Sequence, residues 1–594
     1  MATKKVSGPK KPKIAPAAKR WNSDVIVDMF RMYDFPYAAL NPGSSFRGLH
    51  DSMINYGRNY PEMLLCPHEE VAVQIAHGYA KASGKPMLAV VHDVVGLLNS
   101  CLAVYYAYID RAPIFIAGAT GPLAEAQRRP KIDWIHTANV QGEAVRNYTK
   151  WDAQPATIDG VPELFARAYG IMMSEPQGPI YMCYDAGLQE AELKHEVALP
   201  PQAAAKVPTP IAADPTALAE AADLLVAAKH PVIMVEYAGR NPQSFHDLVN
   251  LAETVSAPVY DVNSRLNFPG CHPLNMSMVN DVFKDADLVM CLDVRDWERA
   301  TTTLDKIKRV TKSIVPKKCK WIDIGFSDLE ISGWAMEYQR LLNADLRVLA
   351  DTATAIPALR KLCRTRVAKT ASLKTRNAAR ESKIKKMHLA ARAKWEKEAK
   401  QNWNQKPMTL PRLASEVWDV IKNEDWVLTA NTLQDWALKL WDFDKPHRHP
   451  GKSLGTSTQI GISLGVALAH KGTGRLVVDI QPDGDLMFNL GSLWVASKYE
   501  IPMLVVMYNN RAYYNDWEHQ LRMARLRGTP EERAHIGMDL FGPEPDFAGV
   551  ARSLGWHAEG PIENGDDVAG ALRRAIVEVK AGRPALVDTI TQKR

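Results

Sequence analysis

Residues 481–516 read QPDGDLMFNLGSLWVASKYEIPMLVVMYNNRAYYND, and this stretch decides the fold class. The β-branched run from Arg475 to Ile480 predicts a buried parallel strand that ends where Asp483-Gly484-Asp485 begins a turn. The apolar spacing from Leu486 to Tyr499 predicts a helix, and the run from Ile501 to Tyr508 predicts a second buried strand. The order strand, turn, helix, strand indicates a parallel α/β unit.

Two oxygen-bearing side chains fall at the carboxyl edge of this predicted sheet. Asp483 follows the first strand, and Asn510 follows the second, 27 positions later. In parallel α/β units ligands gather at this edge, where a helix N-terminus offers unpaired N–H groups to a phosphate. Oxygen ligands of this kind, together with diphosphate oxygens, suit Mg²⁺. The pattern therefore predicts a metal-held diphosphate, although a turn or a helix cap explains the same residues taken alone.

The stretch resembles the Gly-Asp-Gly to Asn-Asn signature of thiamine diphosphate enzymes. The resemblance implies a metal site formed by Asp483, Asn510 and the backbone carbonyl of Ala512. It implies further contacts with thiamine diphosphate from a set of neighbouring residues: Gly484, Asp485, Asn510, Tyr513 and an apolar prop at Thr458 or, with a shift, Ile460. Two residues depart from the signature, because Pro482 replaces its first glycine and Asp485 brings a carboxylate beside the diphosphate.

The N-terminal half carries a second signature. Pro67-His68-Glu69-Glu70 precedes VAVQIAHGYAKASGKPMLAVVHD, a predicted helix followed by a strand. This segment resembles the pyrimidine-binding segment of the same superfamily, which implies that Glu69 is catalytic. There, a carboxyl group bonded to N1′ of the aminopyrimidine favours the imino tautomer, whose nitrogen removes the C2 proton of the thiazolium. The alternative for Glu69 is a first-turn acid that complements the helix dipole, the role we assign to Glu70.

The order of the two signatures is that of the acetolactate synthase, pyruvate oxidase and benzoylformate decarboxylase branch. The resemblance and the alternating strand and helix patterns predict three doubly wound, mainly parallel α/β domains. The predicted segments are a disordered basic tail (1–20), a pyrimidine-binding domain (21–190), a linker (191–210), a central domain (211–363), a basic helical connector (364–407) and a diphosphate-binding domain (408–594). The resemblance implies a homodimer or homotetramer whose active site is shared between subunits, and it leaves FAD in the central domain open.

Composition indicates an ordinary protein of the cytoplasm. The chain of 594 residues is 46% hydrophobic and 24% charged, with no segment apolar enough to span a membrane. Its 7 cysteines form no C-x-x-C pair, which favours reduced core thiols. Residues 1–20 contain seven lysines or arginines and no acidic residue, and the whole chain has a net charge of +6. The rest of the chain is therefore close to neutral. The basic residues of 364–400 favour a solvated connecting helix over nucleic-acid binding.

Two candidate residues for the substrate lie at predicted strand ends. Asn41-Pro42-Gly43-Ser44 and Val90-Val91-His92-Asp93 resemble segments of benzoylformate decarboxylase, which implies that Ser44 and His92 orient a carboxylate and transfer a proton. A turn hydroxyl and an imidazole held by Asp93 are the alternatives. His136 is a weaker candidate.

The resemblance as a whole implies a thiamine diphosphate- and Mg²⁺-dependent, non-oxidative decarboxylase or carboligase acting on a 2-oxo acid. A lyase acting on a 2-hydroxyacyl-CoA or a hydroxyketone is the alternative within enzymes. A non-catalytic homologue that only binds thiamine diphosphate is the alternative of another class, because Pro482 and Asp485 depart from the signature.

Overall fold

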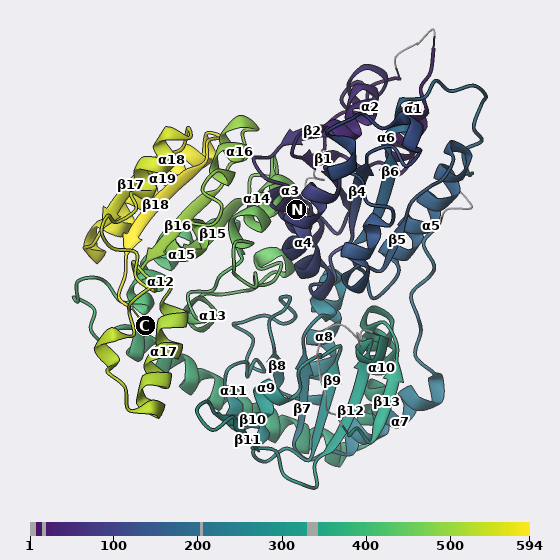
Figure 1. Ribbon diagram of the computed structural model, residues 1–594. Coiled ribbons are helices and arrows are strands. Elements are labelled where there is room, and N and C mark those ends of the chain that lie inside the picture. The colour runs from purple at the N-terminus through teal and green to yellow at the C-terminus, as the bar shows by residue number, and fades with distance from the viewer. Residues whose placement is uncertain (1–7, 15–18, 202–205, 330–342, 594) are drawn as a thin grey trace.

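The computed structural model describes residues 8–14, 19–201, 206–329 and 343–593. It shows three parallel α/β domains, each beside the other two (Figure 1). Their sheets confirm the predicted fold class. Of the predicted disordered tail, residues 1–7 and 15–18 lie outside the described residues, whereas Lys11 donates from Nζ to the carbonyl of Arg31 at 2.5 Å. Among the described helices, none combines the length and the apolar character needed to cross a bilayer.

The N-terminal domain is built on a six-stranded parallel sheet in the order β2-β1-β3-β4-β6-β5. Its strands are β1 (Tyr37–Leu40), β2 (Glu62–Leu65), β3 (Met87–Val91), β4 (Ile114–Thr120), β5 (Trp151–Ala153) and β6 (Ile180–Asp185). Its helices are α1 (Asn22–Met32), α2 (Arg47–Asp51), α3 (Glu69–Ser83), α4 (Val94–Ile109), α5 (Val161–Met173) and α6 (Ala186–Glu190). Helix α3 ends at Gly84, whose φ of 67° is the left-handed conformation that favours glycine after a helix.

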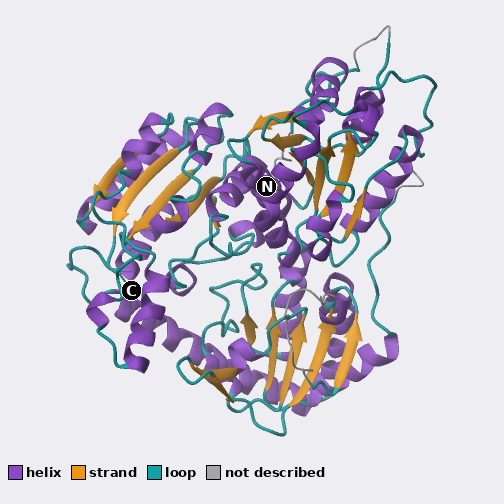
Figure 2. Ribbon diagram, viewed as in Figure 1, coloured by secondary structure: helices purple, strands orange, loops and turns teal. Residues whose placement is uncertain are grey.

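The central domain carries a five-stranded parallel sheet in the order β13-β12-β9-β7-β8, seen in Figure 2 beneath the other two domains. Its strands are β7 (Pro231–Val235), β8 (Val259–Asp261), β9 (Leu288–Leu292), β12 (Lys320–Gly325) and β13 (Leu346–Leu349), with an antiparallel hairpin of β10 (Thr302–Asp305) and β11 (Val310–Ser313). Its helices are α7 (Pro215–Ala227), α8 (Pro242–Val255), α9 (Glu298–Thr301) and α10 (Thr352–Ala368).

The C-terminal domain repeats the architecture with strand order β14-β15-β16-β18-β17. Its strands are β14 (Trp426–Thr429), β15 (Leu476–Pro482), β16 (Leu504–Asn509), β17 (His557–Ile562) and β18 (Ala585–Ile590). Its helices are α12 (Leu410–Ile421), α13 (Trp436–Leu440), α14 (Gln459–His470), α15 (Asp483–Leu486), α16 (Ser492–Lys498), α17 (Tyr514–Arg527), α18 (Phe547–Ser553) and α19 (Gly565–Lys580).

The helix predicted from Leu486 to Tyr499 is wrong in its extent. The chain forms two short helices, α15 and α16, with a break that contains Asn489. The Asn489 side chain donates a hydrogen bond to the carbonyl oxygen of Ser457 at 2.9 Å. Asparagine competes with helical hydrogen bonding in this way, and here its partner lies on a distant loop. The break therefore helps to position that loop.

Helices α3 and α14 join the N-terminal and C-terminal domains through one continuous hydrophobic core. Side chains of both helices, among them Ile75 and Ile462, belong to this core. The backbones meet at glycines, since a Cβ added at Gly78 would collide with the carbonyl oxygen of Ile462, and one added at Gly465 with that of Ile75. Glycine is the residue that allows such a close backbone approach. This contact joins the two domains within a single chain.

The connector helix α11 (Ala371–Ala399) is only partly solvated, in contrast to the prediction. Arg380 is 9% exposed. Its guanidinium donates to the carbonyl oxygens of Ser256 at 2.9 Å, Ala228 at 3.2 Å and Lys229 at 3.0 Å. These carbonyls lie at the C-terminal ends of α7 and α8, where backbone oxygens have no intrahelical donor. Some of the basic residues that suggested a solvated surface therefore cap helices of the central domain.

Replacing Arg380 should destabilise the central domain. We expect Arg380→Ala to lower the free energy of unfolding by about 2–4 kcal/mol, because several buried carbonyls lose a charged donor. Urea unfolding of the full chain measures the change. Lys386→Ala, at an exposed position of the same helix, is the matched control. Equal stability of the two variants would contradict the capping role.

Candidate active site

The predicted metal ligands lie together at the carboxyl edge of the C-terminal sheet. Strands β15 and β16 are neighbours, with Pro482 opposite Tyr508, so Asp483 and Asn510 emerge side by side. Asp483 is 1% exposed, and its Oδ2 accepts a hydrogen bond from the N–H of Ala512 at 3.0 Å. Burial raises the pKa of Asp483 to about 7.

The amide oxygen of Asn510 is an unsatisfied group. Its Oδ1 is buried and has no hydrogen-bond partner within the described part of the chain. A buried polar oxygen without a partner costs free energy unless a ligand satisfies it. One carboxylate, one unpaired amide oxygen and adjacent backbone groups form a hard oxygen donor set, the kind that Mg²⁺ prefers. The residues present therefore fit a metal-held diphosphate.

Gly484 and Tyr513 form the wall beside these ligands. A Cβ added at Gly484 would lie 2.7 Å from Cδ1 of Tyr513, so the tyrosine ring covers this glycine closely. The ring also meets Phe488 edge to face, with centroids 6.2 Å apart. Burial raises the pKa of the Tyr513 hydroxyl, and the nearby carboxyl of Asp483 adds to the shift. Both residues thus border the metal site, and direct contact with a cofactor stays a prediction.

Asp485 accepts hydrogen bonds from backbone groups, and its predicted contact with the cofactor stays a prediction. Its Oδ1 accepts the N–H of Ser457 at 2.8 Å, and its Oδ2 accepts the N–H of Gln459 at 3.3 Å. Gln459 is the first residue of α14, so the carboxylate satisfies donors at the start of this helix. Burial raises the pKa of Asp485 to about 6. The carboxylate is paired with backbone donors and positions the loop before α14.

Removing this carboxylate should loosen the loop. We expect Asp485→Ala to lower the free energy of unfolding by about 1–3 kcal/mol, because two buried N–H groups lose their acceptor. Affinity for thiamine diphosphate should fall by about tenfold if the loop borders the cofactor. Calorimetric titration and thermal unfolding measure the two effects. Asp567→Ala, at an exposed position in the same domain, is the control, and wild-type values for both variants would contradict the positioning role.

The two candidates for the apolar prop lie on either side of the start of α14. Thr458 is fully buried, and its hydroxyl donates to the carbonyl oxygen of Gly455 at 2.8 Å and bonds the Ser453 hydroxyl at 3.0 Å. Ile460 is also fully buried and belongs to the core between α3 and α14. The Thr458 hydroxyl is therefore used within its own loop, whereas Ile460 is apolar and buried in the first turn of α14, and the prop at either position stays a prediction.

Glu69 and Glu70 begin α3 and contact different parts of the molecule. Glu69 is 6% exposed, and its Oε2 accepts a hydrogen bond from Asn99 of α4 at 3.2 Å. A Cβ added at Gly96 would lie 2.9 Å from Oε1 of Glu69, so the glycine of Val94-Val95-Gly96 leaves room for this carboxylate. Those three residues form the first turn of α4.

Glu70 is a connecting residue that sequence reasoning assigned only to the helix dipole. Its carboxylate accepts a hydrogen bond from the hydroxyl of Ser457, and Gln74 donates to it at 3.0 Å. Gln74 also donates to the carbonyl oxygen of Ser457 at 3.1 Å. Because Ser457 lies 387 positions from Glu70, no local pattern could have shown this contact.

Ser457 therefore links the two predicted halves of the site. Its hydroxyl contacts Glu70, the neighbour of Glu69, and its backbone N–H contacts Asp485, two residues after Asp483. Ser457 thus lies between the turn that carries Glu69 and the turn that carries Asp483, and it bonds to a residue of each turn. In this chain the halves meet within one molecule, and sharing between subunits stays a prediction.

The substrate candidates lie at the ends of β1 and β3. Nδ1 of His92 forms a hydrogen bond of 2.8 Å with the hydroxyl of Ser45, not with that of Ser44. Ser44 is exposed and lines a cavity of about 410 Å³ together with Asp93 and His136. Burial lowers the pKa of His92 and raises that of Asp93. Ser45 was missed because the predicted signature ends at Ser44.

The glycine before these serines is required by His92. A Cβ added at Gly43 would collide with the imidazole ring of His92. Beside it, the Asn41 side chain donates to the carbonyl oxygen of Cys66 at 2.9 Å and holds the ends of β1 and β2 together. The segment Asn41-Pro42-Gly43-Ser44 thus shapes the space around His92.

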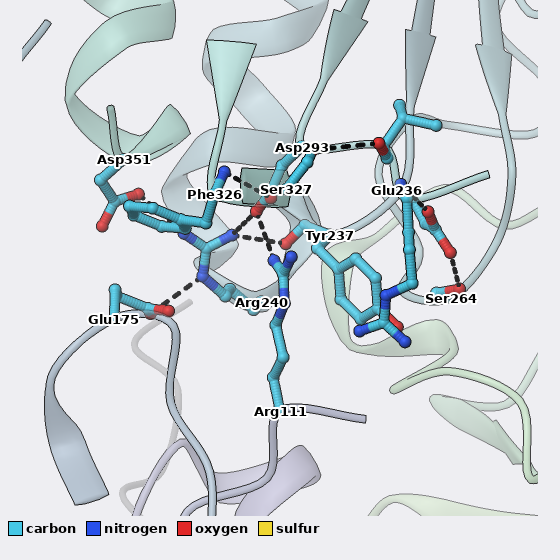
Figure 3. A network of polar contacts seen from close by, with 12 residues as sticks. Arg111, Glu175, Glu236, Tyr237, Arg240, Ser264, Asp293, Phe326, Ser327 and Asp351 are labelled. Atoms are coloured by element: carbon cyan, nitrogen blue, oxygen red, sulfur yellow. Dashed lines mark hydrogen bonds and ion pairs between the residues drawn. The ribbon is translucent and has the colours of Figure 1, made fainter. Parts of the chain in front are cut away.

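A network of paired charges lies at the carboxyl edge of the central sheet and includes residues of the N-terminal domain (Figure 3). Arg240 forms ion pairs with Glu175 at 2.9 Å, Asp293 at 2.7 Å and Asp351 at 2.9 Å, and Arg111 meets Asp293 at 2.7 Å. Although burial opposes ionisation, the two arginines hold the pKa of Asp293 below its ordinary value. Asp293 follows β9, at the sheet edge where ligands of such domains bind.

Arg295, two residues after Asp293, also bonds to neighbouring groups. It donates from Nη2 to the carbonyl oxygen of Ile109 at 2.8 Å, and its backbone N–H donates to Glu236 at 2.6 Å. Together with the Arg240 network, this contact ties the N-terminal domain to the central domain. These contacts do not test for FAD, which stays an open prediction for the central domain.

Comparisons with known proteins agree with this geometry. Residues 20–143 match the N-terminal TPP binding domain of thiamine pyrophosphate enzymes, and residues 430–589 match their C-terminal TPP binding domain. A protein of Oryza sativa named "Probable acetolactate synthase 2, chloroplastic" is 22% identical over 97% of this chain and 84% of its own length.

Solved structures show the same fold. The benzoylformate decarboxylase of Polynucleobacter necessarius gives a TM-score of 0.72 at 18% identity, covering 97% of this chain and 99% of that one. The thiamine diphosphate-dependent 4-hydroxybenzoylformate decarboxylase of Rhodococcus jostii gives 0.73 at 17%, covering 97% and 100%. The fold and site define a cofactor-dependent enzyme whose two half-sites lie on different domains. The chain carries both TPP binding domains and belongs to the thiamine pyrophosphate enzymes.

Proposed function

We propose that the protein is a thiamine diphosphate- and Mg²⁺-dependent, non-oxidative decarboxylase or carboligase that acts on a 2-oxo acid. The observation that carries the proposal is the link through Ser457, which holds the Glu69 turn against the Asp483 turn. A protein that only stored the cofactor would need the metal half of this arrangement and would not need a buried carboxylate at Glu69, next to the residue that Ser457 contacts.

Binding and activation fall to different side chains. Asp483, the unpaired Oδ1 of Asn510 and the carbonyl of Ala512 would hold Mg²⁺ and the diphosphate. Thiamine diphosphate, when bound, supplies the carbanion stabilisation that loss of CO₂ from a 2-oxo acid requires. Glu69 would hold a proton at N1′ of the aminopyrimidine, with its carboxylate oriented by Asn99.

The N-terminal loops would bind and protonate the substrate. His92 is held by Ser45 through Nδ1, and its Nε2, which lies 3.1 Å from Oδ2 of Asp93, would transfer the proton. Ser44 lines the cavity beside it and is suited to a substrate carboxylate. Release of an aldehyde or capture of a second carbonyl compound would then complete the reaction.

The alternative of a non-catalytic homologue loses its main support. It rested on Pro482 and Asp485, and Asp485 now has a structural role at the start of α14. Pro482 ends β15 and precedes the first turn of α15, where a missing N–H is tolerated.

A panel of 2-oxo acids tests the proposed function. The protein, loaded with thiamine diphosphate and Mg²⁺, is incubated with each acid, with and without an aldehyde acceptor, and CO₂ and products are measured. We expect CO₂ release from at least one acid. Cleavage of a 2-hydroxyacyl-CoA without CO₂ release from any acid would instead establish the lyase.

The assembly is part of the same proposal. We propose a homodimer or homotetramer in the cytoplasm, since the implied family assembly shares its active site between subunits. Light scattering after gel filtration measures the mass, and a monomer at assay concentrations would contradict it.

A further inference from the structure

A second group of metal-ligating side chains lies in the N-terminal domain, away from Asp483. His92 and Asp93 follow β3, and His136 lies in the loop after β4. Oδ2 of Asp93 lies 3.1 Å from Nε2 of His92 and 4.0 Å from Nε2 of His136. Ligand atoms of all three residues lie within 4.8 Å of one another.

The carboxylate oxygen at the centre of this group has no hydrogen bond. Asp93 is fully buried, and its Oδ1 accepts the N–H of Val95 at 3.1 Å. Its Oδ2 has no hydrogen-bond partner in the described part of the chain, although Nε2 of His92 is only 3.1 Å away. The two atoms are close without being aligned for a hydrogen bond. Such a buried oxygen needs another partner.

The outer nitrogens of both imidazoles are held by oxygen atoms. Nδ1 of His136 donates to the carbonyl oxygen of Ile132 at 2.9 Å, since a carbonyl can only accept. This bond places the lone pair of His136 on Nε2, which faces Asp93. Nδ1 of His92 bonds the hydroxyl of Ser45 at 2.8 Å. Metal-ligating histidines are usually oriented by such a bond on the other ring nitrogen.

The group opens on a cavity. Asp93 and His136 line the space of about 410 Å³ that also contains Ser44. The arginines around this cavity are paired, Arg47 with Glu190 at 2.7 Å and Arg129 with Asp133 at 2.8 Å. A carboxylate balances the charge of each arginine, which reduces the repulsion of a cation at the candidate site. A cation held by three protein ligands would keep a coordination position open to the cavity.

We propose that His92, Asp93 and His136 bind a divalent transition cation of the Zn²⁺ type. Two imidazole nitrogens and one carboxylate oxygen are a donor set that such cations take. Ligand atoms around tetrahedral Zn²⁺ lie about 3.3 Å apart, so the His92–Asp93 pair at 3.1 Å fits, and His136, whose Nε2 lies 4.0 Å from Asp93, would move toward the other two on binding. The open position would take an oxygen of a small ligand in the cavity.

This site shares His92 with the proposed decarboxylation, so a bound cation would inhibit that reaction. A cation on Nε2 of His92 occupies the lone pair that proton transfer needs. Occupancy by the cation and proton transfer by His92 therefore exclude each other. Binding can be measured without substrate, so failure of the metal site and failure of the proposed reaction are distinguishable.

Cobalt provides the test, because Co²⁺ substitutes for Zn²⁺ and is visible. The full chain is treated with chelator, loaded with thiamine diphosphate and excess Mg²⁺ to fill the site at Asp483, and titrated with Co²⁺. We expect one equivalent to bind with the visible bands of a nitrogen- and oxygen-ligated ion. His136→Ala should weaken binding by about 100-fold or more.

Two further variants make the result decisive. His195→Ala removes an exposed histidine that pairs with Asp159, and it should bind Co²⁺ as the wild type does. Asp93→Asn keeps the shape of the site and should bind at least about tenfold more weakly, which covers the case in which His136→Ala fails to fold. No visible Co²⁺ complex in the wild type, or one that persists in both cluster variants, would overturn the proposal.

Discussion

Glu69→Gln should lower turnover by about 10²–10⁴-fold while thiamine diphosphate and Mg²⁺ still bind. Glutamine keeps the size of the side chain and its acceptor for Asn99, which donates to Glu69 at 3.2 Å. It cannot exchange a proton with the aminopyrimidine. Since the metal ligands Asp483 and Asn510 lie on another domain, their hold on the diphosphate should not change.

Three measurements separate activation from binding in this variant. Product formation and exchange of the C2 proton should both fall, while calorimetric affinity for the cofactor stays within a few-fold of wild type. Glu163→Gln is the matched control, because it makes the same substitution at an exposed position of the same domain. Similar rates in Glu69→Gln and wild type would refute the assigned role.

The features predicted correctly are those that depend on residues close together in the sequence. The strands next to Asp483 and Asn510 and the helix that begins at Glu69 were recognisable because apolar periodicity and capping residues are local. The edge at which the ligands gather then follows from parallel topology. These features required no knowledge of how the domains pack.

Long-range contacts could not be read in this way. The role of Asp485 depends on backbone N–H groups of Ser457 and Gln459, in a loop that the sequence marks only as polar. Likewise Arg380 looked like one more charge on a basic helix until its partners at the ends of α7 and α8 were in place. The sequence shows that these residues are charged, but their hydrogen-bond partners depend on tertiary packing.

Asp483→Asn is expected to weaken Mg²⁺-dependent cofactor binding by about 100-fold, the upper end of the loss seen when a metal's outer partners are removed. Asparagine keeps an oxygen acceptor for the N–H of Ala512, which lies 3.0 Å from Oδ2 of Asp483, but it lacks the negative charge. Calorimetric titration with and without Mg²⁺ measures the loss. Asp516→Ala, at an exposed position nearby, is the control.

Mixing the two inactive variants would show whether the site lies within one chain. If Glu69 and Asp483 of different subunits meet, a mixed dimer of Glu69→Gln and Asp483→Asn contains one intact site, and about a quarter of wild-type activity returns. If they meet within one chain, as α3 and α14 do here, every site keeps one substitution and no activity returns.

Asp483→Asn should weaken cofactor binding, but near neutral pH it should make the cofactor-free protein more stable than the wild type. Burial raises the pKa of Asp483 from 3.8 to about 7, so the folded state favours the protonated carboxyl. A raised carboxyl pKa gives stability that is present below the unfolded pKa and is lost as the pH rises to the folded pKa. Wild-type protein without cofactor should therefore lose stability between about pH 4 and 7, and Asp483→Asn should lose less. Thermal unfolding across this range measures the difference. If the variant bound cofactor as tightly as wild type and followed the same pH profile, Asp483 would be neither the metal ligand nor the strained carboxylate of this site.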